Sequence, residues 1–306
     1  MMNKDDSLRA KLDRGDFVVT AEVTPKLSAS AADLIEQAQP LKGLVDAVNV
    51  TDGAGARVAM SSLAASALLR QDGMEPIMQM TCRDRNRIAI AADLIGAAAH
   101  GIQNLLVLKG DDPAGGDEPE AKPVFDLDSQ DIIVMARRMS DEGKLPSGRE
   151  FTSRPDFNVG AADVPFDPPA DWKPDRLREK VDAGIGFVQT QFCFDPSLAK
   201  RYFDRLDAFG LLDRTSIIVG IGPIISARSA RWMNDNLFGV TVPDSVVKRL
   251  EDAADEAAEG LALCVELIDA YKNMPGVAGV HVMAPAQGAQ RIADAVATAL
   301  PGRLSP

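Results

Sequence analysis

The sequence predicts a (β/α)8 barrel, a closed ring of eight parallel strands each followed by a helix, as a single domain over residues 1–306. Short apolar runs alternate with longer amphipathic runs along the chain, as in parallel α/β proteins. Eight apolar runs can be counted, and eight strands close such a barrel. No glycine-rich fingerprint follows the first run, which disfavours a doubly wound sheet, the other arrangement that this alternation allows.

The eight expected strands are apolar runs bounded by polar or turn-forming residues. They cover residues 17–25, 46–52, 75–82, 104–111, 156–162, 186–192, 216–223 and 278–285. The segments between them have helical periodicity, and several end in glycine, as helices commonly do. Two segments fit the alternation less well: residues 143–155 precede the fifth strand, and residues 242–273 indicate a long additional helix after the seventh.

The composition restricts the kinds of partner. Hydrophobic residues make up 46% of the chain, enough for a large core, and the net charge is −12. This acidic balance argues against nucleic acid or an anionic membrane as the main partner. The absence of a long apolar run or a signal peptide predicts a cytoplasmic protein without a membrane segment. The three cysteines are widely spaced, so we expect neither a disulfide framework nor a metal site.

Strand alternation places polar side chains on one face of most strands. In the first strand Thr20, Glu22 and Thr24 share a face, while the apolar residues take the face that packs under the helices. The same alternation predicts inward polar residues in six more strands: Asn49 and Thr51, Gln79 and Thr81, Lys109 and Asp111, Asn158, Gln189 and Gln191, and His281. Because barrel enzymes carry their chemistry at the carboxyl ends of the strands, we expect a polar site there.

Four of these residues are candidates for specific roles. Glu22 could act as a general acid or base, with a structural carboxylate as the alternative. Asp111 could bind a polar heterocycle or pair with Lys109, and Gly110 between them allows close approach of the backbone. An inward Lys109 could instead form a Schiff base with a carbonyl substrate. His281 fits a core or substrate-contacting histidine better than a metal ligand.

The remaining motifs lie in loops. Asp84 is expected to cap the helix that follows it, while Arg83 or Arg85 could face an anionic ligand. The glycine-rich residues 220–226 could cradle phosphate, but we favour the interpretation that they make room for a ligand ring at the barrel mouth. Residues 111–123 and 163–174 are candidate lids, with plain surface loops as an equally good interpretation.

The motifs of the chain resemble those of the methylenetetrahydrofolate reductase family. The resemblance rests on AEVTP, NVTDGAGARVAMS, EPIMQMTCRDRN, NLLVLKGDDP, REKVDAGIGFVQTQFCFD and IIVGIGPI, in this order. It is closest to the short bacterial branch without a regulatory domain. The resemblance implies a (β/α)8 barrel and the reduction of 5,10-methylenetetrahydrofolate to 5-methyltetrahydrofolate in one-carbon metabolism. In the family, NAD(P)H reduces FAD, and the flavin then reduces the folate.

The resemblance also implies roles for individual residues. Glu22 matches a glutamate that assists protonation of the folate N10, and Asp111 matches an aspartate close to both pterin and flavin. Folate contacts are expected from Asp111, Gln191, Gln189 and His281. Cofactor contacts are expected from Thr51, Gln79, Lys109, Gly110 and Lys180.

The resemblance is weaker at the positions that contact the flavin than at those that contact the folate. The best-known bacterial branch has other residues, several of them aromatic or basic, at the positions of Gln79, Lys109, Gly160, Glu179 and Ala227. We therefore expect FAD to bind weakly or not at all, with hydride passing directly from NAD(P)H to the folate. Two alternatives remain: a folate-binding partner in methyl transfer without reductase activity, and a Schiff-base lyase using Lys109. A homo-oligomer is possible.

Overall fold

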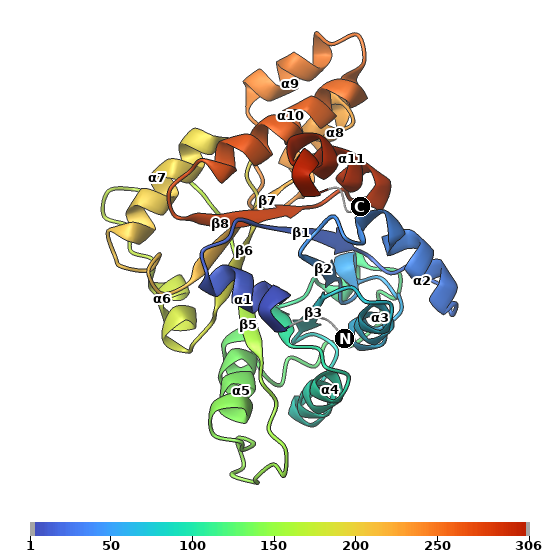
Figure 1. Cartoon of the computed structure of the whole chain (residues 1–306), viewed down its shortest axis with the longest axis vertical. Helices are drawn as coiled ribbons and strands as arrows, with labels where there is room; N and C mark the ends of the chain where they lie inside the picture. The colour runs from blue at the N-terminus through green and yellow to red at the C-terminus, as the bar shows by residue number, and fades with distance from the viewer. Residues whose placement is uncertain (1–3, 304–306) are drawn as a thin grey trace.

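A computed structural model describes residues 4–303 of the chain. Eight parallel strands close into a barrel in which each strand pairs with the next along the chain and β8 pairs with β1. Helices surround the ring of strands (Figure 1). The predicted (β/α)8 barrel is confirmed. No helix within residues 4–303 is long and apolar enough to cross a membrane.

All eight expected strands form, with small differences at their ends. The strands are β1 Val18–Val23, β2 Ala47–Val50, β3 Pro76–Thr81, β4 Asn104–Leu108, β5 Asn158–Asp163, β6 Phe187–Phe192, β7 Ser216–Ile221 and β8 Val277–Val282. The difference that matters for the site is at β4, which ends at Leu108, three residues before the predicted end at residue 111.

The helices alternate with the strands as expected. They are α1 Leu8–Asp13, α2 Ala31–Ala38, α3 Ser62–Gln71, α4 Arg87–Ala99, α5 Ser129–Asp141, α6 Asp175–Asp182, α7 Pro196–Asp207, α8 Ala227–Asn236, α9 Asp244–Glu251, α10 Glu256–Lys272 and α11 Ala289–Ala299. Short 3-10 helices are η1 Lys4–Asp6, η2 Gln39–Leu41, η3 Ala54–Ala56, η4 Pro113–Gly115 and η5 Pro301–Arg303.

Capping residues correct two of the sequence-based expectations. The side chain of Asn86 accepts the backbone N–H groups of Ile88 and Ala89 and so caps α4, whereas Asp84 was expected in this role. The long helix expected over residues 242–273 is two helices, because Asp255 caps the start of α10 after a break. In Figure 1, α9 lies at the top of the molecule, on the far side of α10 from the strands.

The barrel interior is closed at its amino-terminal end by apolar side chains. This inner cluster consists of Leu8, Val18, Ala47, Ile77, Leu106, Phe187 and Ile218. Leu8 belongs to α1, which lies across the strands in Figure 1, and it is fully buried. The backbone N–H of Leu8 donates to Glu75 Oε1 at 3.0 Å, which ties α1 to the start of β3. The end of the barrel opposite α1 is therefore where a ligand can enter.

Glycines in the strands allow close packing inside the barrel. A Cβ at Gly220 would collide with the carbonyl oxygen of Thr190, and one at Gly222 would collide with that of Met283. Gly220 makes room for the backbone of β6, and Gly222, just after β7, makes room for the backbone that follows β8, so the expected role in making room for a ligand ring is not what the structure shows. A Cβ at Gly160 would meet the ring of Phe187, which occupies the space beside β5.

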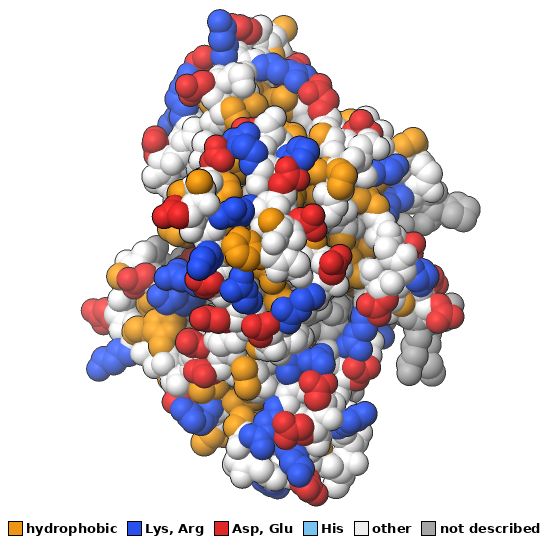
Figure 2. All heavy atoms as spheres, turned by 90° about the vertical axis from the view of Figure 1, so that its left-hand side faces the viewer, with side chains coloured by type: hydrophobic (Ala, Val, Ile, Leu, Met, Phe, Trp, Pro, Cys, Tyr) orange, Lys and Arg blue, Asp and Glu red, His pale blue; other side chains and the backbone are white. Residues whose placement is uncertain are grey.

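Acidic and basic side chains are interspersed on the face shown in Figure 2, without a large field of one sign. Among the exposed charged residues, Arg201 pairs with Asp167 at 2.9 Å and Arg214 with Asp182 at 2.7 Å. Paired surface charges of this kind contribute little to stability, about 0–1 kcal/mol each. They leave this face without the basic stripe that nucleic-acid binding requires.

Candidate functional site at the carboxyl ends of the strands

A network of carboxamide and hydroxyl groups fills the barrel above the apolar cluster. The Asn49 and Gln189 side chains form two mutual hydrogen bonds, of 2.5 and 3.0 Å, across the interior. Gln189 Nε2 also donates to Thr20 Oγ1 at 3.0 Å. All three residues are at most 3% exposed. The predicted inward direction of Thr20, Asn49 and Gln189 is confirmed, and their buried polar atoms are paired with one another.

This network orients the only histidine of the barrel interior. Thr20 Oγ1 lies 2.9 Å from His281 Nδ1 and already accepts from Gln189. This contact fixes the orientation of the imidazole ring in the barrel. The other ring nitrogen, His281 Nε2, lies 3.9 Å from Glu22 Oε2.

Glu22 lies near the end of β1, where two nitrogen atoms face its carboxylate. Gln79 Nε2 is 3.5 Å from Glu22 Oε2, and His281 Nε2 faces the same oxygen. The Glu22 side chain is 22% exposed, whereas that of His281 is 4% exposed. The carboxylate thus has neighbours from β3 and β8 and remains accessible to solvent or a ligand.

Asp111 lies on the rim of the barrel and not on an inward strand face. Gly110, with a φ of +92°, turns the chain after β4, and Asp111 is exposed. Its Oδ2 accepts a hydrogen bond from the backbone N–H of Gly55 at 2.7 Å, across the loop that follows β2. The second oxygen, Oδ1, accepts no hydrogen bond from residues 4–303 and is free to contact a ligand.

The predicted inward direction of Lys109 is wrong. In β4, Leu106 belongs to the inner cluster and Leu108 packs against it, so the even-numbered residues face the interior. Lys109 follows the end of the strand, is exposed, and places Nζ 5.9 Å from the centroid of Phe125. A Schiff-base lysine requires a desolvated amine. The lyase alternative required an inward Lys109, and the structure does not show one.

Gln191, expected on the folate, uses both ends of its carboxamide within the protein. Its Nε2 donates to the carbonyl oxygen of Phe238 at 3.3 Å, and its Oε1 accepts the backbone N–H of Phe192 at 3.0 Å. Phe238 is 87% exposed in the loop between α8 and α9. A ligand bound by Gln191 would compete with this loop. The joint binding of a pterin by Asp111 and Gln191 stays a prediction.

Among the residues expected to contact a cofactor, Thr51 has a buried hydroxyl group that lacks a hydrogen-bond partner within residues 4–303. It is 2% exposed, and its hydroxyl oxygen has no hydrogen-bond partner in the part of the chain that the structure describes. A buried hydroxyl left unpaired costs about 1–3 kcal/mol, so such groups in native proteins commonly have a ligand or water. The orphaned hydroxyl fits a bound polar group at the end of β2.

Lys180 lies behind β5, on its outer side. Its Nζ donates to the carbonyl oxygen of Ala162 at 2.8 Å, and burial lowers the pKa of its ammonium group. The neighbouring Asp163 carboxylate accepts the hydroxyl of Tyr202 at 2.5 Å, and burial raises the pKa of this carboxyl group. Sequence reasoning missed Asp163 and Tyr202, because the predicted fifth strand ended at residue 162 and Asp163 was assigned to the loop over residues 163–174.

A cavity of about 670 Å³ opens beside this group. It contains the basic side chains of Lys173, Arg176 and Lys180. Phe166 and Trp172 form an aromatic wall, with ring centroids 5.1 Å apart. Cationic side chains beside flat rings suit the pyrophosphate and base of a dinucleotide.

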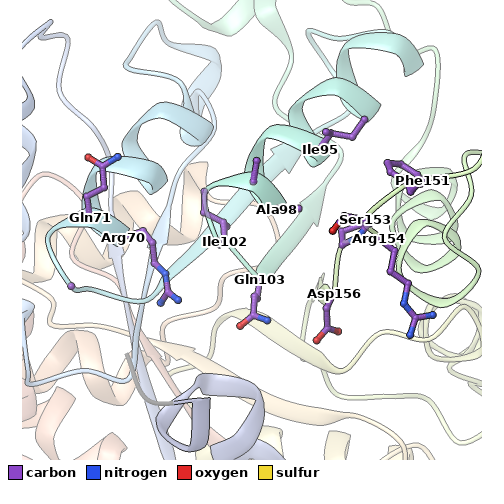
Figure 3. A pocket seen from close by; sticks show the side chains of 14 residues that line it. Arg70, Gln71, Ile95, Ala98, Ile102, Gln103, Phe151, Ser153, Arg154 and Asp156 are labelled. Carbon is purple, nitrogen blue, oxygen red and sulfur yellow. The ribbon is translucent and has the colours of Figure 1, made fainter. Parts of the chain in front are cut away.

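A second cavity lies away from these residues. It is a groove of about 800 Å³ between the carboxyl ends of α3 and α4 and the segment before β5. Figure 3 shows Arg70, Gln103 and Asp156 at one side, and Ile95 and Phe151 facing one another at the other. It contains none of the residues expected to bind folate or cofactor. Although this groove is large, we do not assign the predicted chemistry to it.

The fold and the site define a (β/α)8-barrel protein with an enzyme-like constellation of acid, imidazole and carboxamides at the carboxyl ends of its strands. The comparison with known families is more specific. The chain belongs to the methylenetetrahydrofolate reductase family, whose pattern matches residues 7–292. The resemblance noted in the sequence is thereby confirmed.

Individual relatives are distant. The chain is 28% identical over 238 residues to methylenetetrahydrofolate reductase 2 of Schizosaccharomyces pombe, covering 74% of this chain and 35% of that protein. It is 25% identical over 191 residues to 5,10-methylenetetrahydrofolate reductase of Escherichia coli, covering 60% and 56%. The chain thus spans about a third to just over half the length of these relatives.

A solved structure supports the fold over the whole chain. An uncharacterized protein from Clostridium thermocellum, described as binding two copies of 5-methyl-5,6,7,8-tetrahydrofolic acid, superposes with a TM-score of 0.65. The alignment covers 97% of this chain and 98% of that protein at 14% sequence identity. At this identity the match establishes the shared barrel architecture.

Proposed function

We propose that this protein reduces 5,10-methylenetetrahydrofolate to 5-methyltetrahydrofolate, with NAD(P)H as the source of the hydride. The observation that carries the proposal is the Glu22 carboxylate, held at the carboxyl end of β1 beside Gln79 and His281 and partly open to solvent. Membership of the reductase family supports the choice of substrate.

Glu22 supplies the proton that this reaction needs. Opening of the methylene bridge breaks the bond between the methylene carbon and N10, and N10 takes a proton from the Glu22 carboxyl group. The methylene carbon, left as an iminium on N5, accepts the hydride and becomes the methyl group. Gln79 and His281 orient the carboxyl group, which takes up a proton from solvent for the next turnover.

The remaining site residues bind and orient the folate and the nicotinamide cofactor. The free Oδ1 of Asp111 accepts N–H groups of the pterin edge, and Gln191 adds a carboxamide once it releases Phe238. NAD(P)H, when bound, supplies the hydride. The Thr51 hydroxyl and the basic side chains of Arg176 and Lys180 are the groups that would hold a dinucleotide.

The test is steady-state oxidation of NADH or NADPH with methylenetetrahydrofolate, with 5-methyltetrahydrofolate identified chromatographically. We expect stoichiometric formation of product and oxidised nicotinamide. Tight folate binding without nicotinamide oxidation, under both aerobic and anaerobic conditions and with FAD supplied, would instead identify a folate-binding partner in methyl transfer. Borohydride trapping is expected to leave Lys109 unmodified.

A further inference from the structure

Arg83 is buried at the carboxyl end of the barrel and has no place in the chemistry described above. It follows β3 by two residues and is 4% exposed. Its Nε and Nη2 donate to the two carboxylate oxygens of Asp84 at 2.7 and 2.8 Å. This bidentate pair fixes the plane of the guanidinium group, and with it the direction of the remaining nitrogen, Nη1.

Nη1 points between two loops that do not pair as strands. It lies 3.2 Å from the carbonyl oxygen of Gly53, after β2, and 3.4 Å from that of Asp111, after β4. In the barrel β3 separates β2 from β4, so their following loops are not joined by the strand ladder. The guanidinium group of Arg83 is a donor shared by the two loops.

The glycines of these loops make room for Arg83. A Cβ at Gly53 would lie 2.5 Å from Arg83 Nη2, and a Cβ at Gly110 would lie 3.0 Å from Arg83 Cβ. Both glycines have positive φ, +63° and +92°, a conformation that other residues adopt at a cost. Gly53 and Gly110 are therefore explained by their positive φ and by their closeness to Arg83, with Thr81 also close to Gly110.

The two loops also join each other above Arg83. The backbone N–H of Gly55 donates to Asp111 Oδ2 at 2.7 Å. The backbone N–H of Val58 donates to both carboxylate oxygens of Asp117, at 3.0 and 3.1 Å. A Cβ at Gly116 would collide with the carbonyl oxygen of Ala56. Residues 53–58 and 111–117 therefore form one unit, here called the joined loops.

We propose that Arg83 is a positioning residue, which holds the joined loops from below and so fixes the Asp111 carboxylate for the folate ring. The inference rests on the proposed function, because it takes Asp111 as a folate contact. Arg83 itself does not touch the substrate. Without its guanidinium group the carbonyl oxygens of Gly53 and Asp111 lose a buried donor. Among the described residues, Gly53 then keeps the hydrogen bond from the Ala56 amide, and Asp111 keeps the one from Gly55.

The first experiment is hydrogen exchange of the ligand-free protein, followed by mass spectrometry. In Arg83→Gln we expect the amides of Gly55 and Val58 to exchange roughly tenfold faster, with strand amides unchanged. Arg83→Lys, which retains one charged donor, should show a smaller effect. The control is Arg87→Gln, which removes an exposed arginine paired with Asp126 and should leave the joined loops unchanged. Unchanged exchange at residues 53–58 in Arg83→Gln would overturn the proposal.

The second experiment is a double-mutant cycle on folate binding. Arg83→Gln should weaken folate about tenfold and leave NAD(P)H affinity within about twofold, since a change of ~1.4 kcal/mol is tenfold. In the background of Asp111→Ala the same change should cost nothing further, because the group that Arg83 positions is gone. Additive losses, or faster exchange with unchanged folate affinity, would show that Arg83 has only a structural role.

Two further measurements separate the possible failures. Folate binding by the unaltered protein tests the proposed function before any variant is made, whereas hydrogen exchange needs no folate. If Arg83→Gln does not fold, Asp117→Ala loosens the joined loops from their exposed side and should reproduce the loss of folate affinity. A normal folate affinity in Asp117→Ala, with fast exchange at Val58, would contradict the positioning role.

Discussion

At the scale of single residues, Glu22 has the most specific prediction. Glu22→Gln keeps the shape of the side chain and removes its acidic proton, so we expect folate binding to persist while turnover falls by about 10²–10⁴-fold, the usual contribution of general acid catalysis. The measurement is kcat with saturating substrates, together with a folate titration. Glu36→Gln, the same change on an exposed position of α2, is the control. Turnover within about threefold of the unaltered protein would exclude Glu22 as the acid.

Asp111 is the second residue-scale prediction. Asp111→Ala removes the acceptor for the Gly55 amide and for the pterin edge. We expect folate affinity to fall by about 1–3 kcal/mol, the cost of leaving a polar partner unpaired, with a smaller loss for the nicotinamide cofactor. Calorimetric titration with each ligand measures both. Glu120→Ala, exposed in the same loop, controls for charge. Equal losses for the two ligands would point to a general disturbance of the site.

At the scale of elements, Glu75 joins α1 to β3 and β4. Its Oε1 accepts from Leu8 N and from Asn104 Nδ2 at 2.7 Å, while Oε2 is buried without a partner among the described residues. Burial raises the pKa of this carboxyl group above its ordinary value of 4.5. The folded state therefore holds the proton more tightly than the unfolded state. The resulting stabilisation is present below pH 4.5 and is lost as the pH rises through the raised pKa.

Glu75→Gln should remove this dependence, because an amide keeps the accepting oxygen and does not ionise. We expect its melting temperature to exceed that of the unaltered protein by a few degrees at pH 8 and the difference to shrink toward pH 5. Differential scanning calorimetry across this range is the measurement, with the exposed Glu118→Gln as the matched control. A difference that grows on acidification would contradict the expected sign.

At the scale of the whole molecule, the prediction concerns the cofactor. We expect FAD to bind weakly or not at all, because the best-known bacterial branch has other residues, several of them aromatic or basic, at the positions of Gln79, Lys109, Gly160, Glu179 and Ala227. The Lys109 ammonium group lies over the ring of Phe125 and not on an inward strand face. Each lost aromatic contact removes about 0.5–1.5 kcal/mol of stacking, and ~1.4 kcal/mol is tenfold in affinity. An absorption spectrum of protein purified without added flavin, then calorimetric titration with FAD and with NADH, measures this. A yellow protein with stoichiometric FAD would contradict the expectation.

How far the sequence predicts the site depends on where a residue lies relative to a strand. Strand alternation correctly placed Thr20, Asn49 and Gln189 inside the barrel, because a strand fixes side-chain direction with a period of two. It failed for Lys109, because the even-numbered residues of β4 face the interior, and because Lys109 follows the end of the strand, where Gly110 turns the chain. The direction of a side chain in a loop is set by contacts with other loops, and the local sequence does not reveal those contacts.

The sequence by itself determined the eight strands, the barrel, the inward polar layer and the position of Glu22 on it, because all of these follow from apolar periodicity along single segments. Only the tertiary structure decided which groups meet. It placed His281 and Gln79 beside Glu22, Asp163 beside Tyr202, and Arg83 beneath the loops of Gly53 and Asp111. These contacts join residues up to hundreds of positions apart, and closure of the barrel brings them within hydrogen-bonding distance.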